Sequence, residues 1–404
     1  MSTQRRGLTA AIKALPRPIW ILFGGTFINR FGSFVGVFIV LYLTRKGYSV
    51  PQAGLALAAF GLGSLPGSAL GGYLADRVGR RETLVLATFV NAAATVGLAL
   101  VQGLPLILVL MAIVGISFQA QRAPVAAMIA DLVPAEHRLA AMGLMRFFVN
   151  AGFAAGPAAA GLLADRSFLL LFGGDAITSV IFGAIALVGL PGGTPRSAQP
   201  ERRGEATRAI LADPGFLVFL LASVLASAVY LQANSTFPLW VKANGYSNAV
   251  YGGLISVNGV VIILAELVLI AFTQKFQARP VIATGFVMIA IGFALTAVAH
   301  NLAMLALTVL IWTFGEMTAF PMSLAHVANI SPAHLRGRYQ GTWGLSWAAG
   351  GLTVGPLLGT WLYATNPYLL WLGCGVLGIV AAALVMFTPA SRPAATDPGL
   401  ASEP

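Results

Sequence analysis

Residues Gly143–Gly161 read GLMRFFVNAGFAAGPAAAG, a long apolar stretch interrupted by glycine and proline. It places these helix-disfavouring residues at Gly143, Gly152, Gly156, Pro157 and Gly161. Each interior glycine costs a helix about 1 kcal/mol relative to alanine, and proline costs about 3 kcal/mol. In lipid they are tolerated because neighbouring helices approach closely and bind the freed backbone groups. The stretch predicts a membrane helix that packs tightly and bends, and ordinary small-residue packing in a bundle is the simpler interpretation.

The composition indicates an integral membrane protein. Of 404 residues, 58% are hydrophobic and only 9% are charged, whereas a soluble domain carries about 25% charged residues. The net charge of +11 comes from basic residues in short loops between apolar spans. Such loops fit orientation in a membrane better than binding of nucleic acid. The single cysteine, Cys374, excludes an intramolecular disulfide and a cysteine-based metal site.

Twelve apolar segments are long enough to span a bilayer, which requires roughly 20 residues each. They are 19–43, 53–74, 83–101, 104–129, 140–164, 168–190, 215–241, 250–272, 280–298, 302–328, 340–363 and 367–387. The predicted fold class is therefore an all-α integral membrane protein with twelve transmembrane helices.

Charge asymmetry predicts the orientation. With both termini in the cytoplasm, the cytoplasmic segments hold 17 Lys and Arg residues and the external loops hold 4. Cytoplasmic loops carry the excess of basic residues in membrane proteins. We therefore expect a multi-pass protein of the cell inner (plasma) membrane. The basic N-terminus lacks an apolar core with a cleavage site and is interpreted as a retained tail.

The segment 191–213 is rich in proline, glycine and charge, and it divides the chain into two halves. The predicted organisation is an N-tail (1–18), a six-helix half (19–190), a cytoplasmic linker (191–213), a second six-helix half (214–388) and a C-tail (389–404). Within the linker, residues 205–213 fit either a short amphipathic helix on the membrane surface or a solvated loop.

The two halves repeat each other in sequence. ADLVPAEHR at Ala130–Arg138 aligns with ANISPAHLR at Ala328–Arg336, 198 residues later. Gly152, Gly156 and Pro157 align with Gly351, Gly355 and Pro356, 199 residues later. Two matches at nearly one offset indicate duplication. Parallel repeats place the substrate site between the halves near the middle of the membrane.

The loop between the second and third spans reads GYLADRVGRR at Gly72–Arg81, with one carboxylate among three guanidinium groups. Asp76 is suited to accept charge-assisted hydrogen bonds there or to cap a helix, and a simple positive-inside anchor is the alternative. The loop resembles the signature G-x-L-a-D-r-x-G-r-r of the major facilitator superfamily. The resemblance covers the whole chain and implies two pseudo-symmetric six-helix bundles. It also implies a cytoplasmic gate that holds the outward-open state, formed by Gly72, Asp76, Arg77, Gly79 and Arg80.

The fifth span resembles the antiporter motif of that family, G-x8-G-x3-G-P-x-x-G-G, and departs from it at Ala160. The resemblance implies proton-coupled export. The second copy has Thr342 and Thr360 opposite Gly143 and Gly161, so these two glycines carry most of that inference. Arg122-Ala-Pro-Val and Phe27-Ile-Asn29-Arg30 also resemble the branch that contains many drug:proton antiporters, although the glycines that follow the family's buried arginine are replaced here.

Six charged residues lie within the predicted spans: Arg30, Arg122, Arg146, Asp175, Glu266 and Glu316. Each costs about 2.5–3.5 kcal/mol at mid-membrane. The family resemblance implies that the first, fourth, seventh and tenth spans line the central cavity. The substrate-cavity candidates are therefore Asn29, Arg30, Arg122, Tyr230, Gln232 and Asn234. The duplicated halves do not share these charges, because Phe320 aligns with Arg122 and Phe118 with Glu316.

Glu266 and Glu316 are the leading candidates for proton coupling, and Asp175 is the third. Burial favours the neutral form of a carboxyl group, so such a group can load and release a proton near neutral pH. Asp175 lies nearer the outer end of its span, where water can reach it. Arg30 and Arg122 either bind an anionic group, hold a carboxylate charged until substrate displaces it, or form a structural salt bridge. Arg146 is expected to be structural.

An aromatic face runs along the first span at Phe23, Phe27, Phe31, Phe34 and Phe38. It either lines an apolar drug cavity or, as the commoner alternative, packs the bundle and faces lipid.

The predicted function is secondary active transport by alternating access, most simply proton-coupled efflux of small amphipathic, drug-like compounds. The alternative is a proton symporter for a sugar or organic-anion metabolite, for which Asn29, Gln119, Gln121, Gln232, Asn234 and Asn258 supply polar groups. An enzyme, a sensor or an ATP-driven pump is disfavoured, because no nucleophile elbow, metal cluster or phosphate loop occurs. We expect a monomer without cofactor or metal, whose partners are protons, the bilayer and a small-molecule substrate, and not nucleic acid.

Overall fold

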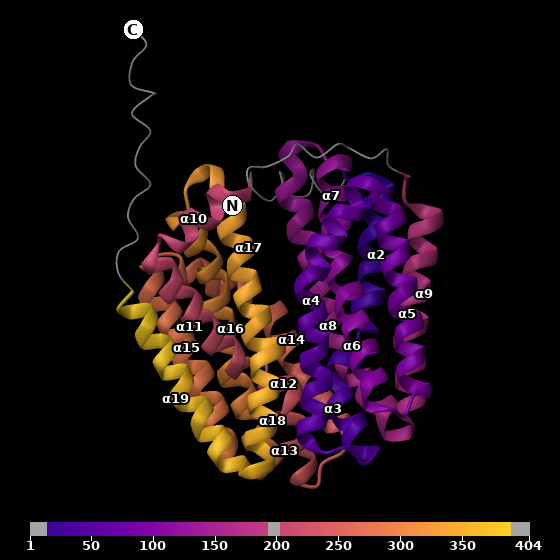
Figure 1. Cartoon of the computed structure of the whole chain (residues 1–404). Coiled ribbons are helices and arrows are strands. Elements are labelled where there is room, and N and C mark those ends of the chain that lie inside the picture. The colour runs from indigo at the N-terminus through magenta and orange to yellow at the C-terminus, as the bar shows by residue number, and fades with distance from the viewer. Residues whose placement is uncertain (1–13, 193–202, 389–404) are drawn as a thin grey trace.

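The computed structural model describes residues 14–192 and 203–388, and within these ranges the regular structure is helical, with no strand. The predicted tails and the middle of the linker lie largely outside the described residues. Figure 1 shows two helical bundles side by side, the first indigo to magenta and the second pink to yellow. The first bundle consists of α2 (Arg17–Phe31), α3 (Val35–Arg45), α4 (Val50–Arg77), α5 (Arg80–Leu100), α6 (Leu104–Ala120), α7 (Arg122–Leu132), η1 (Ala135–His137), α8 (Arg138–Arg166) and α9 (Phe168–Gly189).

A short helix in the linker, α10 (Arg203–Leu211), precedes the second bundle. That bundle consists of α11 (Pro214–Tyr230), α12 (Gln232–Ser235), α13 (Phe237–Ala243), α14 (Asn248–Thr273), α15 (Ala278–Leu295), η2 (Thr296–Val298), α16 (Leu302–Ile330), η3 (Ala333–Leu335), α17 (Arg336–Trp347), η4 (Ala348–Val354), α18 (Gly355–Thr365) and α19 (Pro367–Met386). We call the end of the molecule that carries α10 the linker face, and the opposite end, which carries α13, the far face (Figure 1).

Eleven helices in the described ranges are long and apolar enough to cross a membrane. The remaining predicted span, 340–363, is also present, as a rod made of α17, η4 and α18. Its middle section, η4, winds as a π-helix, so none of its three pieces reaches the length of a span. Gly350 and Gly351 lie in this section, and an added Cβ would lie 2.3 Å from Val224 O of α11 at Gly350 and 2.2 Å from the Leu231 side chain, just after α11, at Gly351. Close approach of α11 therefore coincides with the change in winding.

Three other spans are interrupted near their middles. The first breaks between α2 and α3 at Gly32, the fourth at Gln121 and the seventh at Leu231 and Thr236. At the first break an added Cβ on Gly32 would lie 1.8 Å from the Thr178 hydroxyl of α9, so only glycine fits. Such breaks inside membrane segments are tolerated where they face protein or a cavity.

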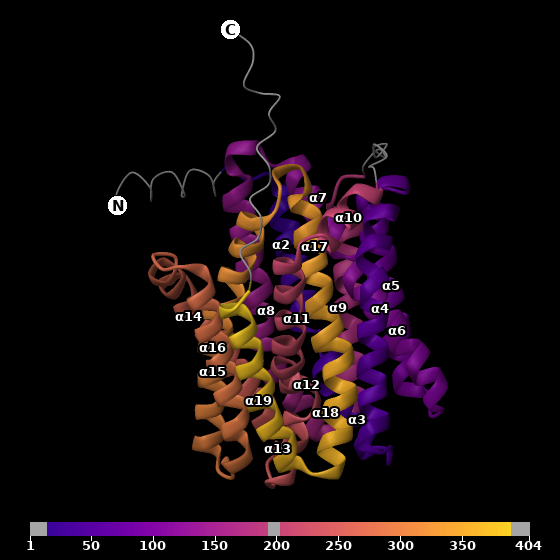
Figure 2. The same ribbon diagram turned by 60° about the vertical axis from the view of Figure 1, so that its left-hand side comes forward.

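The two bundles touch mainly toward the far face. Tyr251 of α14 donates its hydroxyl to the Val37 carbonyl of α3 at 3.2 Å, and its ring packs on Phe38 at 5.3 Å. Figure 2 shows α18 beside α4, in agreement with the close contact of Gly54 with Thr360. One hydrophobic core includes residues of both bundles, whereas a second core around Phe23, near the linker face, contains only residues of the first bundle. The interface is thus asymmetric along the membrane axis.

Candidate functional site

A cavity of about 440 Å³ lies between the bundles, within the range of small-molecule sites. Its walls are mostly apolar and aromatic, with a few polar groups. The first bundle contributes Phe60, Asn91, Phe118, Arg122, Asn150, Phe153 and Asp175 among others, and the second contributes Tyr230, Asn234, Asn258, Trp312 and Glu316. The helix breaks position this wall, because Ser33, Arg122 and Leu231 lie at or next to them.

Glu316 forms the acidic corner of the cavity. The Asn258 amide of α14 donates to Glu316 Oε2 at 3.0 Å and lies 3.0 Å from the Thr313 hydroxyl. The Tyr230 hydroxyl also hydrogen-bonds to Glu316. No Lys or Arg of the described chain forms an ion pair with this carboxylate. Glu316 is therefore held by neutral donors and faces an apolar space, an arrangement that suits a group that gains and loses a proton.

Two arginines form the opposite, basic side of the cavity. Arg122 is the first residue of α7 and lines the space. Arg30 lies behind it, 7% exposed, with its guanidinium carbon 4.2 Å above the Phe118 ring. Neither arginine forms an ion pair in the described part of the chain, and Arg30 Nε and Nη1 have no hydrogen-bond partner there. The expected salt bridge or held carboxylate is therefore absent among these residues.

Of the six predicted cavity residues, Arg122, Tyr230 and Asn234 line the cavity, and Asn29, Arg30 and Gln232 do not. The Asn29 amide points toward the Ser179 hydroxyl of α9 at 3.4 Å. The Gln232 amide donates to the Gly355 carbonyl at 2.9 Å, and its oxygen accepts from Ser235 and Thr236. These side chains tie helices together instead of facing the cavity.

Sequence reasoning missed Asn91, Asn150 and Phe153 as lining residues. Asn150 and Phe153 stand on α8 beside the motif glycine Gly152, and that helix was assigned to packing. An asparagine in an otherwise apolar helix next to a tight contact is the signal that was available. Asn91 also donates to Ser179 at 3.1 Å, from a helix with no other polar cavity residue to indicate it.

Asp175 is 4% exposed and has a clear structural partner. Its Oδ2 accepts from the backbone N–H groups of Phe34 and Val35, at 2.9 and 3.0 Å. The carboxylate thus accepts hydrogen bonds from the free backbone N–H groups at the start of α3, after the break in the first span. The expectation of a wetted position near the outer end is wrong, and its candidacy as a proton carrier stays a prediction.

Glu266 does not line the cavity but forms an ion pair with Arg146. The pair joins α14 to α8 and so connects the two bundles. Arg146 is 45% exposed at its side chain and Glu266 12%. Arg146 therefore has a partner for the structural role expected of it, and the Glu266 carboxylate is held in an ion pair in this conformation.

The glycines of α8 divide between two neighbours. Gly152 and Gly156 approach the α2 backbone, where an added Cβ would lie 2.9 Å from Phe31 N and 2.5 Å from Phe31 O respectively. Gly161 approaches α14, where its Cβ would lie 2.5 Å from the Asn248 carbonyl. Gly143 has no atom within 4 Å of an added Cβ, so the expected tight packing is wrong at this position.

The aromatic face of the first span packs the bundle. Phe23, Phe34 and Phe38 are at most 3% exposed, and none of the five phenylalanines lines the cavity. The aromatic lining comes instead from Phe60, Phe118, Phe153 and Trp312.

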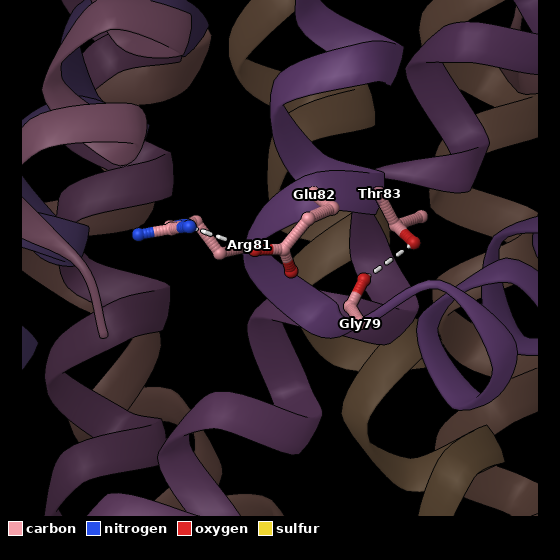
Figure 3. Close-up of polar contacts among 4 residues, drawn as sticks. All are labelled: Gly79, Arg81, Glu82 and Thr83. Atoms are coloured by element: carbon pink, nitrogen blue, oxygen red, sulfur yellow. Dashed lines mark hydrogen bonds and ion pairs between the residues drawn. The ribbon is translucent and has the colours of Figure 1, made fainter. Parts of the chain in front are cut away.

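The loop between α4 and α5 turns at Gly79, whose φ of 118° is a conformation that glycine adopts without strain. Figure 3 shows the Thr83 hydroxyl donating to the Gly79 carbonyl at 2.7 Å and Arg81 paired with Glu82. Arg80 pairs with Asp131 of α7, and Arg77 lies over Tyr73.

Asp76 is exposed and forms no ion pair within the described residues. The expectation that guanidinium groups surround it, or that it caps a helix, is wrong in this conformation, because Gly79 occupies the N-cap of α5. The bundles are in contact toward the far face, at the end of the molecule away from this loop.

The model of the Major Facilitator Superfamily matches residues 22–269 and 233–403. The MFS-type transporter YttB of Bacillus subtilis is 29% identical over 361 residues, which cover 85% of this chain and 88% of that protein. The quinolone resistance protein NorA of Staphylococcus aureus is 23% identical over 373 residues, 88% of this chain and 94% of that protein.

Two solved structures share the fold. A peptide transporter POT superposes with a TM-score of 0.78 at 17% identity and covers 92% of this chain and 94% of its own. A D-xylose-proton symporter gives a TM-score of 0.73 at 18% identity, over 93% of this chain and 98% of its own.

Proposed function

The chain belongs to the major facilitator superfamily and is a membrane transporter, and from this premise we propose that it exports small amphipathic compounds in exchange for protons. The observation that carries the proposal is Glu316. This carboxyl group faces a largely apolar cavity and is held only by the neutral donors Asn258 and Tyr230.

Glu316 couples the two fluxes by competition. When it is deprotonated it attracts a basic or hydrogen-bond-donating substrate, and a proton that arrives from the other side neutralises it and weakens that attraction. Antiport requires only that proton and substrate exclude each other at this one site and that access to the site alternates between the two faces. Glu266 stays a second candidate, because breaking its pair with Arg146 would expose a further carboxylate.

The cytoplasmic side in this proposal is the linker face. In the sequence, the segments predicted to be cytoplasmic hold 17 Lys and Arg residues against 4 in the other loops, and positive charge marks cytoplasmic loops. With the bundles in contact toward the far face, this conformation then corresponds to a carrier that loads from the cytoplasm. In the outward-open state, Asp76, Arg77 and Arg80 would close the linker face.

Two features support export. Gly161 of the antiporter-type motif makes a close contact with α14 of the other bundle, and Gly152 and Gly156 make close contacts with α2 of the same bundle. The similarity to NorA, a quinolone resistance protein, points in the same direction. Gly143, the first glycine of the antiporter motif, makes no such close contact, because an added Cβ there would have no atom within 4 Å.

Proton-coupled uptake of a sugar or organic anion is the second candidate. Asn91, Asn150, Asn234 and Asn258 give the cavity hydrogen-bonding groups that a polar substrate would use. The unpaired Arg122 favours an anionic substrate in that case.

Transport in inverted membrane vesicles with an internal pH-sensitive dye tests the proposal. An exported substrate should collapse an imposed acid-inside gradient, and Glu316→Gln should abolish that response while the protein still elutes as a single species in detergent. Glu82→Gln, on the linker-face loop, is the matched control and should transport normally. Undiminished proton-coupled transport by Glu316→Gln would remove Glu316 from the mechanism.

Right-side-out vesicles separate the two functions. Acidification-linked accumulation of a sugar or organic anion in right-side-out vesicles, without a response to any drug, would favour uptake.

A further inference from the structure

The cavity carries opposite charges on its two walls. The basic wall belongs to the first bundle, with Arg122 at the surface and Arg30 behind it, and the acidic wall belongs to the second bundle, with Glu316. Each charge lacks an ionic partner among the described residues. Arg30 is buried, Glu316 is partly buried and Arg122 is exposed on the cavity wall. A ligand that fills the cavity and pairs with these charges therefore gains affinity.

The basic wall is built to receive an anion. Arg30 is more than nine-tenths buried, and two of its guanidinium nitrogens have no hydrogen-bond partner in the described chain. It lies close enough to Arg122 for their charges to repel each other. Arg122 is the first residue of α7, directly after the break at Gln121.

Neighbouring polar groups on this wall are also unsatisfied. Gln121 is 3% exposed and neither polar atom of its side-chain amide has a hydrogen-bond partner in the described residues. The carboxylate in the first-bundle wall, Asp175, accepts from Phe34 N and Val35 N and is not paired with either arginine. An anionic group would relieve the repulsion between the two arginines and supply acceptors for their donors.

The acidic wall is matched to a cation. Asn258 and Tyr230 donate to Glu316 and orient it. Arg146 and Glu266 also act on its charge, but with opposite signs, and they are paired with each other. The lining also includes Phe118 and Phe153 of the first bundle and Trp312 of the second, which provide an apolar and aromatic surface. A positively charged amine at Glu316 gains both the ionic interaction and contact with aromatic faces.

We propose that the substrates are amphoteric: small compounds with a carboxylate or similar anion for Arg122, an amine for Glu316 and an aromatic body between them. This inference rests on the proposed transport function. It narrows the substrate class from amphipathic compounds in general to amphoteric ones. A simple organic cation would leave Arg30 and Arg122 unpaired, and a simple organic anion would leave Glu316 to be neutralised by a proton alone.

Equilibrium binding to the purified, detergent-solubilised transporter tests the charge requirement without any flux. The probes are norfloxacin and cephalexin, which each carry an amine and a carboxylate. Each is compared with its ester, which keeps only the amine, and with its N-acetyl derivative, which keeps only the carboxylate. For at least one of the two skeletons, the parent compound should bind about tenfold more tightly than either derivative, since a charge-assisted hydrogen bond contributes at least that much.

Variants assign each end of the ligand. Arg122→Gln should weaken binding of the parent compound about tenfold, to the level of its ester, and leave binding of the ester unchanged. Glu316→Gln should weaken binding of the parent compound to the level of the N-acetyl derivative and leave binding of that derivative unchanged. Arg45→Gln, at the far face, is the matched control for loss of one guanidinium and should bind all three forms as the native protein does.

The outcomes are distinct. Equal affinity for parent and ester, an equal effect of Arg122→Gln on both, or no binding by either parent compound overturns the proposal. If the binding pattern holds but no proton-coupled export is seen in vesicles, the amphoteric site stands and the direction of transport is wrong. If simple cationic drugs are exported while the parent compounds do not bind, the export function stands and the amphoteric site is wrong.

Discussion

At the scale of single residues, a buried charge is explained by the groups that surround it. Asp175, Glu266 and Glu316 are all carboxylates within apolar helices, yet their partners differ. Asp175 accepts two backbone N–H groups, Glu266 pairs with Arg146, and Glu316 has only neutral donors. Only the last arrangement leaves a carboxylate in the cavity wall without a fixed role in holding helices.

The cap at Asp175 predicts a separation between stability and coupling. Asp175→Ala leaves two buried N–H groups without an acceptor and should lower the free energy of unfolding by about 1–3 kcal/mol. Asp175→Asn keeps one acceptor oxygen and should recover part of that loss. Thermal denaturation in detergent measures both. Proton-coupled transport should persist in Asp175→Asn, and its loss in a well-folded protein would restore Asp175 as a proton carrier.

At the scale of helices, the contact of α8 with α14 joins the two bundles through small residues. The Pro157 carbonyl would lie 2.1 Å from a Cβ added to Gly252, and Gly259 similarly approaches Ala154. The Ser256 hydroxyl accepts from Ala158 N at 3.0 Å. Such close backbone approach provides dispersion contacts in lipid, where helix association gains no hydrophobic driving force.

This contact predicts opposite effects at adjacent glycines. Gly252→Ala places a methyl group against backbone and should destabilise the protein by about 1–3 kcal/mol. Gly253→Ala meets no atom within 4 Å and should be neutral or stabilise α14 by up to about 1 kcal/mol. The melting temperatures of the two variants, measured in the same detergent, test this prediction. Equal melting temperatures for the two variants would show that α8 and α14 do not pack as described.

At the scale of the whole molecule, the bundles are tied at the far face by a helix cap that crosses between them. Asp165, at the end of α8, accepts from Asn248 N and Ala249 N at the start of α14, at 2.8 and 2.9 Å. These bonds exist only where the far-face ends of the two bundles meet. They therefore stabilise this conformation relative to one that is open at the far face.

Removal of that cap should shift the conformational equilibrium. Asp165 is exposed, so the expected loss is modest, about 1 kcal/mol, which corresponds to about fivefold in the equilibrium. The reporter is Asn234→Cys in a Cys374→Ser background, labelled in intact cells with a membrane-impermeant maleimide. Labelling should be several-fold faster with Asp165→Ala and unchanged with Arg166→Ala. A rate that is equal or slower with Asp165→Ala would exclude the cap as a determinant of the conformation.

Hydropathy and repetition in the sequence predicted the spans and the two halves, because a bilayer admits only helices of a given length and duplication leaves a regular offset. The motif at Gly72–Arg81 predicted the family, and the family resemblance implied that Arg122 lines the cavity. The order of the spans does not specify how each helix is rotated about its axis. The sequence could not show that Asn234 faces the cavity while Gln232, two residues away, binds the Gly355 carbonyl.

The amino-acid sequence by itself therefore determined that this protein is a helical membrane transporter with few charges among its spans. Only the tertiary structure decided which of those charges are paired. Arg80 meets Asp131, distant in sequence, instead of Asp76, and Arg146 meets Glu266 across the bundles, whereas Arg30 and Arg122 meet no carboxylate in the described chain. The reason is physical: an ion pair depends on atoms brought within 4 Å by packing between helices, and such proximity is a property of the folded chain.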